Sequence, residues 1–84
     1  MKKKKLLAKA ISSPNNLHFV ELVTLVQGFG FKLSRTEGSH HIFVLPGTSL
    51  RLNFQNIGSK AKPYQVRQFL KMVEENNLQL ETGE

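Results

Sequence analysis

Residues 31–54 read FKLSRTEGSHHIFVLPGTSLRLNF, and this stretch decides the fold. Gly38–Ser39 and Pro46–Gly47 are turn signals, and they divide the stretch into three segments of strand length. The first and third segments alternate apolar and polar side chains, which is typical of strands with one wet face. The middle segment is apolar on both faces after its first residues, as a central strand would be. The stretch predicts an antiparallel meander of three strands, residues 31–36, 40–45 and 50–55.

Helical periodicity flanks this stretch on both sides. Apolar residues recur at helical spacing from Phe19 to Gln27, and Gly28 and Gly30 then end the segment. A second apolar stripe follows Pro63, which is a residue favoured in the first turn of a helix. Both helices have to bury their stripes on the same face of the sheet. The order therefore predicts an α+β fold, a two-layer α-β-β-β-α sandwich with a three-stranded antiparallel sheet.

The sandwich implies one apolar core and one open sheet face. The predicted core residues are Leu22, Val26, Leu52, Phe54, Val66, Phe69, Leu70 and Val73. The residues predicted on the open face of the sheet are Lys32, Ser34, Thr36, Arg51, Asn53 and Gln55.

The ends of the chain predict a single domain over residues 1–84. Residues 1–13 are expected to be a basic extension or a short helix, with Leu7, Ala10 and Ile11 on one face, and residues 77–84 a tail. Lys9 interrupts the apolar run after the first lysines, so neither an export signal nor a membrane span is expected. Because the chain has no cysteine, disulfide frameworks are excluded and a cytoplasmic location is favoured.

The formal net charge of +6 is concentrated in the body of the fold. Residues 14–73 hold two acids, Glu21 and Glu37, whereas four of the six acids lie near the C-terminus. The basic residues of this body are Lys32, Arg35, Arg51, Lys60, Lys62, Arg67 and Lys71. Such a balance favours a polyanionic partner, of which nucleic acid is the commonest, and a basic surface without a specific ligand is the alternative.

Three histidines are the only side chains suited to proton transfer near neutral pH. His18 precedes the first predicted helix of the sandwich and is expected to be a surface or capping residue. His40 and His41 open the second strand and must point to opposite faces, so one of them at most can face a substrate on the open sheet. From these residues alone, ordinary strand-end histidines remain the simpler interpretation. The sequence has no metal-ligand spacing, catalytic triad or phosphate-binding glycine loop.

The run Gly38-Ser39-His40-His41-Ile42-Phe43 resembles the GSHH-type signature of the HicA (YcfA-like) toxin family. As in that family, a helix ending in Gly28-Phe29-Gly30-Phe31 and a strand bearing Arg35 precede it, and residues 60–70 resemble the closing helix of one branch. The resemblance covers roughly residues 17–78. Two departures are the segment Phe54-Gln55-Asn56, where many members have a Pro-x-His element, and the lysine-rich N-terminus.

The resemblance implies a fold similar to double-stranded RNA-binding domains. It implies a type II toxin that cleaves mRNA independently of the ribosome and is neutralised by a HicB-like antitoxin. Carried over by position, the family's catalytic histidine is His40. No metal or other cofactor is expected, because RNA supplies its own nucleophile, the 2′-hydroxyl.

The residues expected to contact RNA are Arg35, Gly38, Ser39, Lys60, Lys62, Arg67 and Lys71. Gly38 would let the backbone approach a phosphate, and the cations would stabilise its charge. Two other functions stay open: a module that binds structured RNA without cleaving it, and a protein whose main role is to dock an antitoxin through its basic face.

Overall fold

The computed structural model describes residues 3–81, and these form three helices and one antiparallel sheet. The elements in chain order are α1 (Lys3–Ser12), a short 3-10 helix η1 (Pro14–Asn16), α2 (Phe19–Gly28), β1 (Lys32–Glu37), β2 (His40–Val44), β3 (Arg51–Gln55) and α3 (Pro63–Glu75). The strand order β1-β2-β3 makes β2 the central strand. The predicted α-β-β-β-α sandwich is confirmed.

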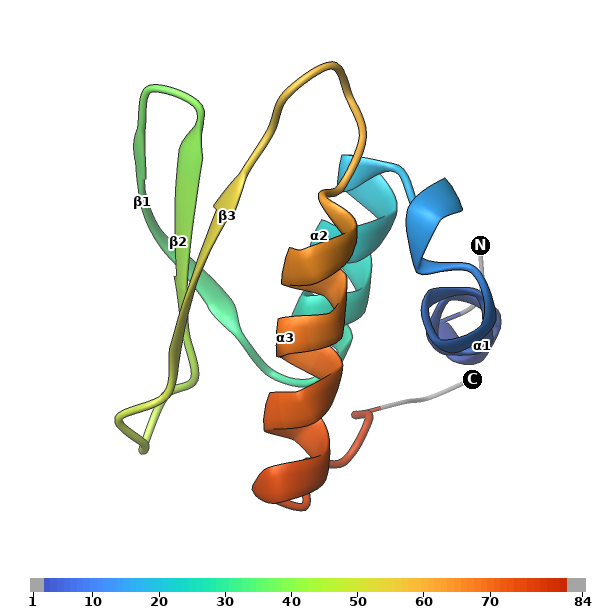
Figure 1. Ribbon diagram of the computed structural model, residues 1–84. Coiled ribbons are helices and arrows are strands. Elements are labelled where there is room, and N and C mark those ends of the chain that lie inside the picture. Colours follow the sequence, from blue (N-terminus) through green and yellow to red (C-terminus); the bar gives the residue numbers. More distant parts are fainter. Residues whose placement is uncertain (1–2, 82–84) are drawn as a thin grey trace.

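One layer of the sandwich is the sheet, and α2 and α3 form the other by covering one of its faces (Figure 1). Helix α1 lies on the far side of α2 and α3 from the sheet. Its buried residues are Leu6 and Ala10, whereas Ile11 is 63% exposed. Of the expected face, Ala10 is buried and Leu7 is partly buried against the core, and the expectation was wrong for Ile11. Residues 1–2 and 82–84, the outermost parts of the expected extension and tail, lie outside the described residues.

The core joins α2 and α3 to the covered face of the sheet. Six of the eight predicted core residues are buried, and Leu70 and Val73 are partly buried against the same cluster. Phe69 is at its centre, with ring centroids 5.4 Å from Phe29 and 6.0 Å from Phe31 in edge-to-face geometry. Such pairs add to the stabilisation from buried apolar area.

A β-bulge in β1 changes which residues share the open face of the sheet. Leu33 is the Cα partner of Phe43, but the next pair along the ladder is Arg35 with Ile42. The extra residue reverses the alternation of β1. Arg35 and Glu37 therefore occupy the open face, and the expectation for Thr36 was wrong because it pairs with His41 on the covered face. Ser34 is the extra residue of the bulge and has no Cα partner in β2.

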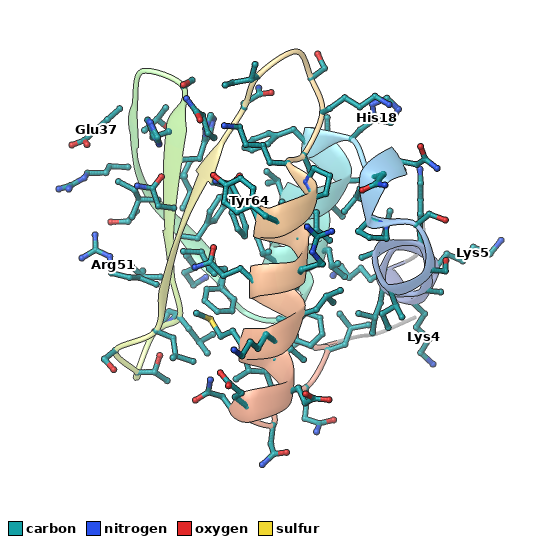
Figure 2. The ribbon with its side chains drawn as sticks, viewed as in Figure 1. Lys4, Lys5, His18, Glu37, Arg51 and Tyr64 are labelled. Atoms are coloured by element: carbon teal, nitrogen blue, oxygen red, sulfur yellow. The ribbon has the colours of Figure 1, made fainter. Side chains whose placement is uncertain are left out.

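The rest of the open face agrees with the predicted alternation. Lys32 pairs with Val44, and β3 contributes Arg51, Asn53 and Gln55 on the same face. Figure 2 shows the side chains of Glu37 and Arg51 pointing away from the helices. Within residues 3–81, no helix has both the length and the apolar character that crossing a membrane requires.

Candidate nucleic-acid interface

The turn between β1 and β2 brings exposed backbone to one end of the open face. Gly38 has φ +60°, a left-handed conformation that favours glycine, and a Cβ built there would meet nothing within 4 Å. The carbonyl of Ser39 accepts a hydrogen bond of 2.9 Å from the backbone N–H of Asn56, just after β3. The turn is therefore held to the neighbouring strand while its outer side stays accessible.

His40 lies directly after this turn, exposed on the open face. Its Nδ1 is 3.0 Å from the side-chain oxygen Oδ1 of Asn53, a diagonal neighbour on β3. Because a carbonyl oxygen only accepts, this contact requires a proton on Nδ1. In the neutral ring the other nitrogen, Nε2, then carries a lone pair directed away from Asn53.

His41 occupies the opposite face, as strand alternation predicts. It is half-buried, and its ring centroid lies 4.9 Å from that of Phe19 at the start of α2. Its Nδ1 donates to the carbonyl of Ser39 at 3.2 Å. His41 is thus part of the packing between sheet and helix, and His40 is the histidine available to a ligand on the open face.

A chain of side-chain hydrogen bonds connects the turn to the start of α3. Gln55, the Cα partner of His40, donates through Nε2 to the hydroxyl of Ser39 at 3.3 Å. Lys62 donates from Nζ to Oε1 of the same glutamine at 2.7 Å. The Lys62 ammonium is also 5.9 Å from the centre of the Tyr64 ring. Ser39 and Lys62, two of the predicted RNA contacts, therefore belong to one network beside His40.

Arg35 lies on the same face and forms an ion pair with Glu37 that the sequence did not predict. Its Nε lies 3.1 Å from a carboxylate oxygen of Glu37, and both side chains are mostly exposed. Glu37 is the Cα partner of His40. Exposed pairs of this kind contribute little stability and exchange easily, so a phosphate can compete with Glu37 for the guanidinium.

The hydrogen bonds that connect the turn, His40 and Lys62 do not involve Lys60, Arg67 or Lys71. Lys60 closes a turn in the loop between β3 and α3, and its backbone forms an antiparallel bridge with His18, the residue before α2. Lys71 lines a groove between α3 and α1 together with Leu7 and Ile11. Arg67 is one helical turn before Lys71 and shares its side of α3.

The histidine before α2 is an exposed residue at the N-cap, in agreement with the predicted surface or capping position. The backbone N–H of His18 donates to Oε1 of Glu21 at 2.9 Å, and Lys9 of α1 forms a 3.0 Å ion pair with the same oxygen. The His18 hydrogen bond is the main cause that lowers the pKa of Glu21, with a further contribution from Lys9, while burial acts in the opposite direction. In the described part of the chain, no group of three or more His, Cys, Asp or Glu side chains could hold a metal ion.

Comparison with known proteins identifies the family. The model of the HicA toxin of bacterial toxin–antitoxin systems matches residues 20–74, more than half of the chain. Neither the curated proteins nor the solved structures gave a match. The matched segment runs from the first turn of α2 to the last turn of α3 and includes the turn before His40. The chain belongs to the HicA family, the toxins of bacterial toxin–antitoxin systems.

Proposed function

We propose that this HicA-family toxin is an endoribonuclease that cleaves mRNA without a metal ion, with His40 as the group that transfers the proton. The observation that carries the proposal is the exposed imidazole of His40, whose Nδ1 is engaged by Asn53 at 3.0 Å while Nε2 stays open to a ligand. An open face suits a long substrate such as RNA, since a polymer cannot enter a closed cavity.

The reaction uses the ribose 2′-hydroxyl as the nucleophile. Nε2 of His40 takes the proton from this hydroxyl as its oxygen attacks the adjacent phosphorus. The bond from phosphorus to the 5′-oxygen breaks, and the imidazolium returns the proton to that oxygen. The products are a 2′,3′-cyclic phosphate and a 5′-hydroxyl, so atoms and charges balance with one histidine. Proton transfer of this kind contributes on the order of 10²- to 10⁴-fold.

The groups around His40 can stabilise charge on the phosphoryl oxygens. Gly38 leaves backbone exposed at the turn, Ser39 offers a hydroxyl, and Lys62 supplies a fixed positive charge within the same hydrogen-bond network. Arg35 supplies a second cation once a phosphate replaces Glu37. We assign Lys60, Arg67 and Lys71 to other phosphates of the RNA, because they are exposed but take no part in the hydrogen-bond network around His40. Lys71 lines the groove between α3 and α1, across α3 from the sheet, and Arg67 shares that side, so RNA has to pass around the molecule to reach these two.

A toxin of this family has an antitoxin partner, and we propose a HicB-like protein that acts by covering the open face. The mRNA substrate places the proposed activity in the cytoplasm. Co-expression of such an antitoxin should abolish growth inhibition by the wild-type chain. Inhibition that persists despite a stable toxin–antitoxin complex would mean that the antitoxin binds elsewhere.

The test compares His40→Ala with the wild type on labelled mRNA in excess chelator. We expect cleavage to fall by about 10²-fold or more, while RNA binding falls much less because the cations remain. The matched control is His18→Ala, since that histidine is also exposed but lies at the N-cap of α2. An all-DNA strand of the same sequence should remain intact.

Equal cleavage by the wild type and His40→Ala, in preparations free of contaminating nuclease, would remove this mechanism. If neither protein cleaves RNA but both bind it with salt-dependent affinity, the chain is an RNA-binding module. The basic body of the fold is the feature that favours this second function.

A further inference from the structure

The observation behind the inference is a buried glutamine that is hydrogen-bonded to a strand edge. Gln65, in the first turns of α3, is 5% exposed. Its side-chain Oε1 accepts from the backbone N–H of Gln55 at 3.1 Å, and its Nε2 donates to the backbone carbonyl of Asn53 at 3.3 Å. One carboxamide thus satisfies the Asn53 carbonyl and the Gln55 N–H on the outer edge of β3, where a fourth strand would otherwise pair.

The two residues held by Gln65 through their backbone are the ones whose side chains hold the site. Residues two apart on a strand point to the same face, so Asn53 and Gln55 both project onto the open face. Asn53 contacts Nδ1 of His40, and Gln55 contacts Ser39 and Lys62. The buried Gln65 amide at the edge of β3 therefore fixes the stretch of backbone from which both polar side chains project onto the open face.

The bond from Asn53 to His40 has a chemical consequence. Neutral imidazole has two tautomers, and the hydrogen bond at one ring nitrogen decides which nitrogen carries the proton. An oxygen acceptor at Nδ1 selects the Nδ1–H form and leaves Nε2 as the base. An imidazole in the other tautomer would present an N–H to the 2′-hydroxyl and could not take its proton.

We propose that Asn53 is a positioning residue that fixes His40 in the Nδ1–H tautomer, and that Gln65 holds Asn53 in place from inside the fold. The role of Asn53 in catalysis rests on the proposed function. The tautomer itself is a property of the free protein. It can be measured whether or not the protein cleaves RNA.

The first experiment is nitrogen NMR of protein with ¹⁵N-labelled histidine, at a pH where the rings are neutral. In the wild type we expect His40 to give a protonated Nδ1 and an unprotonated Nε2. Asn53→Ala should lose this preference, whereas Asn53→Asp should retain it because a carboxylate oxygen still accepts. The matched control is Asn15→Ala, an exposed asparagine in η1.

The second experiment is the pH profile of cleavage at saturating RNA. Asn53→Ala should lower kcat by about tenfold or more with little change in KM, by analogy with residues that orient metal-binding histidines, whose loss costs about ten- to a hundredfold. Asn53→Asp should move the acidic limb to higher pH, because a nearby carboxylate favours the imidazolium. A residue with a merely structural role would not move this limb.

The role of Gln65 is tested by Gln65→Met against Gln68→Met, an exposed glutamine on the same helix. We expect Gln65→Met to broaden or shift the His40 nitrogen signals and Gln68→Met to leave them unchanged. If Gln65→Met does not fold, the Asn53 variants still decide the proposal, because Asn53 is on the surface and its loss leaves the core intact.

A wild-type His40 protonated at Nε2, or an Asn53→Ala spectrum identical to that of the wild type, would overturn the assignment. A folded Gln65→Met with unchanged His40 signals would overturn the part that concerns Gln65. If the wild type shows the Nδ1–H tautomer but His40→Ala cleaves RNA normally, the proposed function fails and the positioning by Asn53 stands.

Discussion

The two faces of the sheet differ in what holds them. On the covered face Phe43, Leu52 and Phe54 are almost completely buried against α2 and α3. On the open face His40 and Asn53 are exposed, and directed hydrogen bonds between side chains set their positions. The covered face carries the stability of the fold. The open face is therefore free to carry polar groups that a core could not accept.

The two adjacent histidines make the comparison sharpest. His41 packs on Phe19 and belongs to the covered face, whereas the ring of His40 contacts the Asn53 side chain and faces solvent. The two residues have the same chemistry and neighbouring positions. Only the alternation of side chains along β2 makes His41 part of the packing and leaves His40 accessible to a ligand.

The largest expected effect is on the covered face, for Phe69→Ala. Removing this fully buried ring leaves a cavity next to Phe29 and Phe31, so the free energy of unfolding should fall by about 3–5 kcal/mol. Chemical denaturation of the variant against Gln68→Ala, an exposed neighbour on α3, measures the difference. A loss below about 0.5 kcal/mol would mean that the core does not depend on Phe69, because ordinary surface substitutions stay within about that range.

His41→Ala should reverse the pattern expected for His40→Ala. It removes a ring contact with Phe19 and a hydrogen bond to the Ser39 carbonyl, so we expect a loss of about 1 kcal/mol in stability. The chemical step of cleavage should be affected much less than in His40→Ala. Denaturation and single-turnover cleavage of both variants measure the two effects. A stable His41→Ala that has lost cleavage would mean that the reactive histidine is His41, on the covered face, and not His40.

A smaller effect separates the cations near His40 from those on α3. Lys62→Gln and Arg67→Gln should each flatten the salt dependence of RNA binding by roughly 0.7–0.9 unit of slope, if each loses one phosphate contact. Only Lys62→Gln should also slow cleavage at saturating RNA, because Lys62 joins the network of Gln55 and Ser39. If Arg67→Gln slows cleavage as much as Lys62→Gln does, the reactive site includes this part of α3. If neither variant changes the salt dependence of RNA binding, these cations do not contact phosphate.

The smallest expected effect concerns pH. The folded-state pKa of Glu21 lies below its ordinary value of 4.5, mainly because the His18 backbone N–H binds the carboxylate. The stability it contributes is therefore complete above that value and is lost as the pH falls through the lower folded pKa. Glu21→Gln should be less stable than the wild type at pH 7, and the gap should narrow toward pH 3 in denaturation curves. A gap of constant size would mean that the charge of Glu21 contributes nothing.

Periodicity predicted the elements because burial in this fold is regular. The alternation after Pro46–Gly47 and the helical stripe after Pro63 reflect which side chains leave water, and the residues they indicated are buried or partly buried in the core. The apolar middle segment indicated the central strand, and Ile42 is 5% exposed although it lies on the open face. A resemblance in the six residues Gly38–Phe43, together with the preceding helix end and the closing helix, then indicated the family.

Features that depend on register could not be predicted in this way. No glycine or proline marks the bulge at Ser34, which appears only when β1 is aligned with β2. The contact between Asn53 and His40 is diagonal across two strands, so it requires a register and a side-chain direction. Gln65 resembles any surface glutamine in the sequence, because nothing there shows that its amide meets the edge of β3.

The bulge and Gln65 together determine how this sheet behaves toward other copies of itself. Unpaired strand edges invite further strands to add, which leads to aggregation. At the β3 edge the Gln65 amide already binds the backbone carbonyl of Asn53 and the backbone N–H of Gln55. At the β1 edge the bulge interrupts the ladder and charged side chains flank it. A toxin that loses its antitoxin can therefore remain a separate molecule, because neither edge of its sheet is a ready template for another strand.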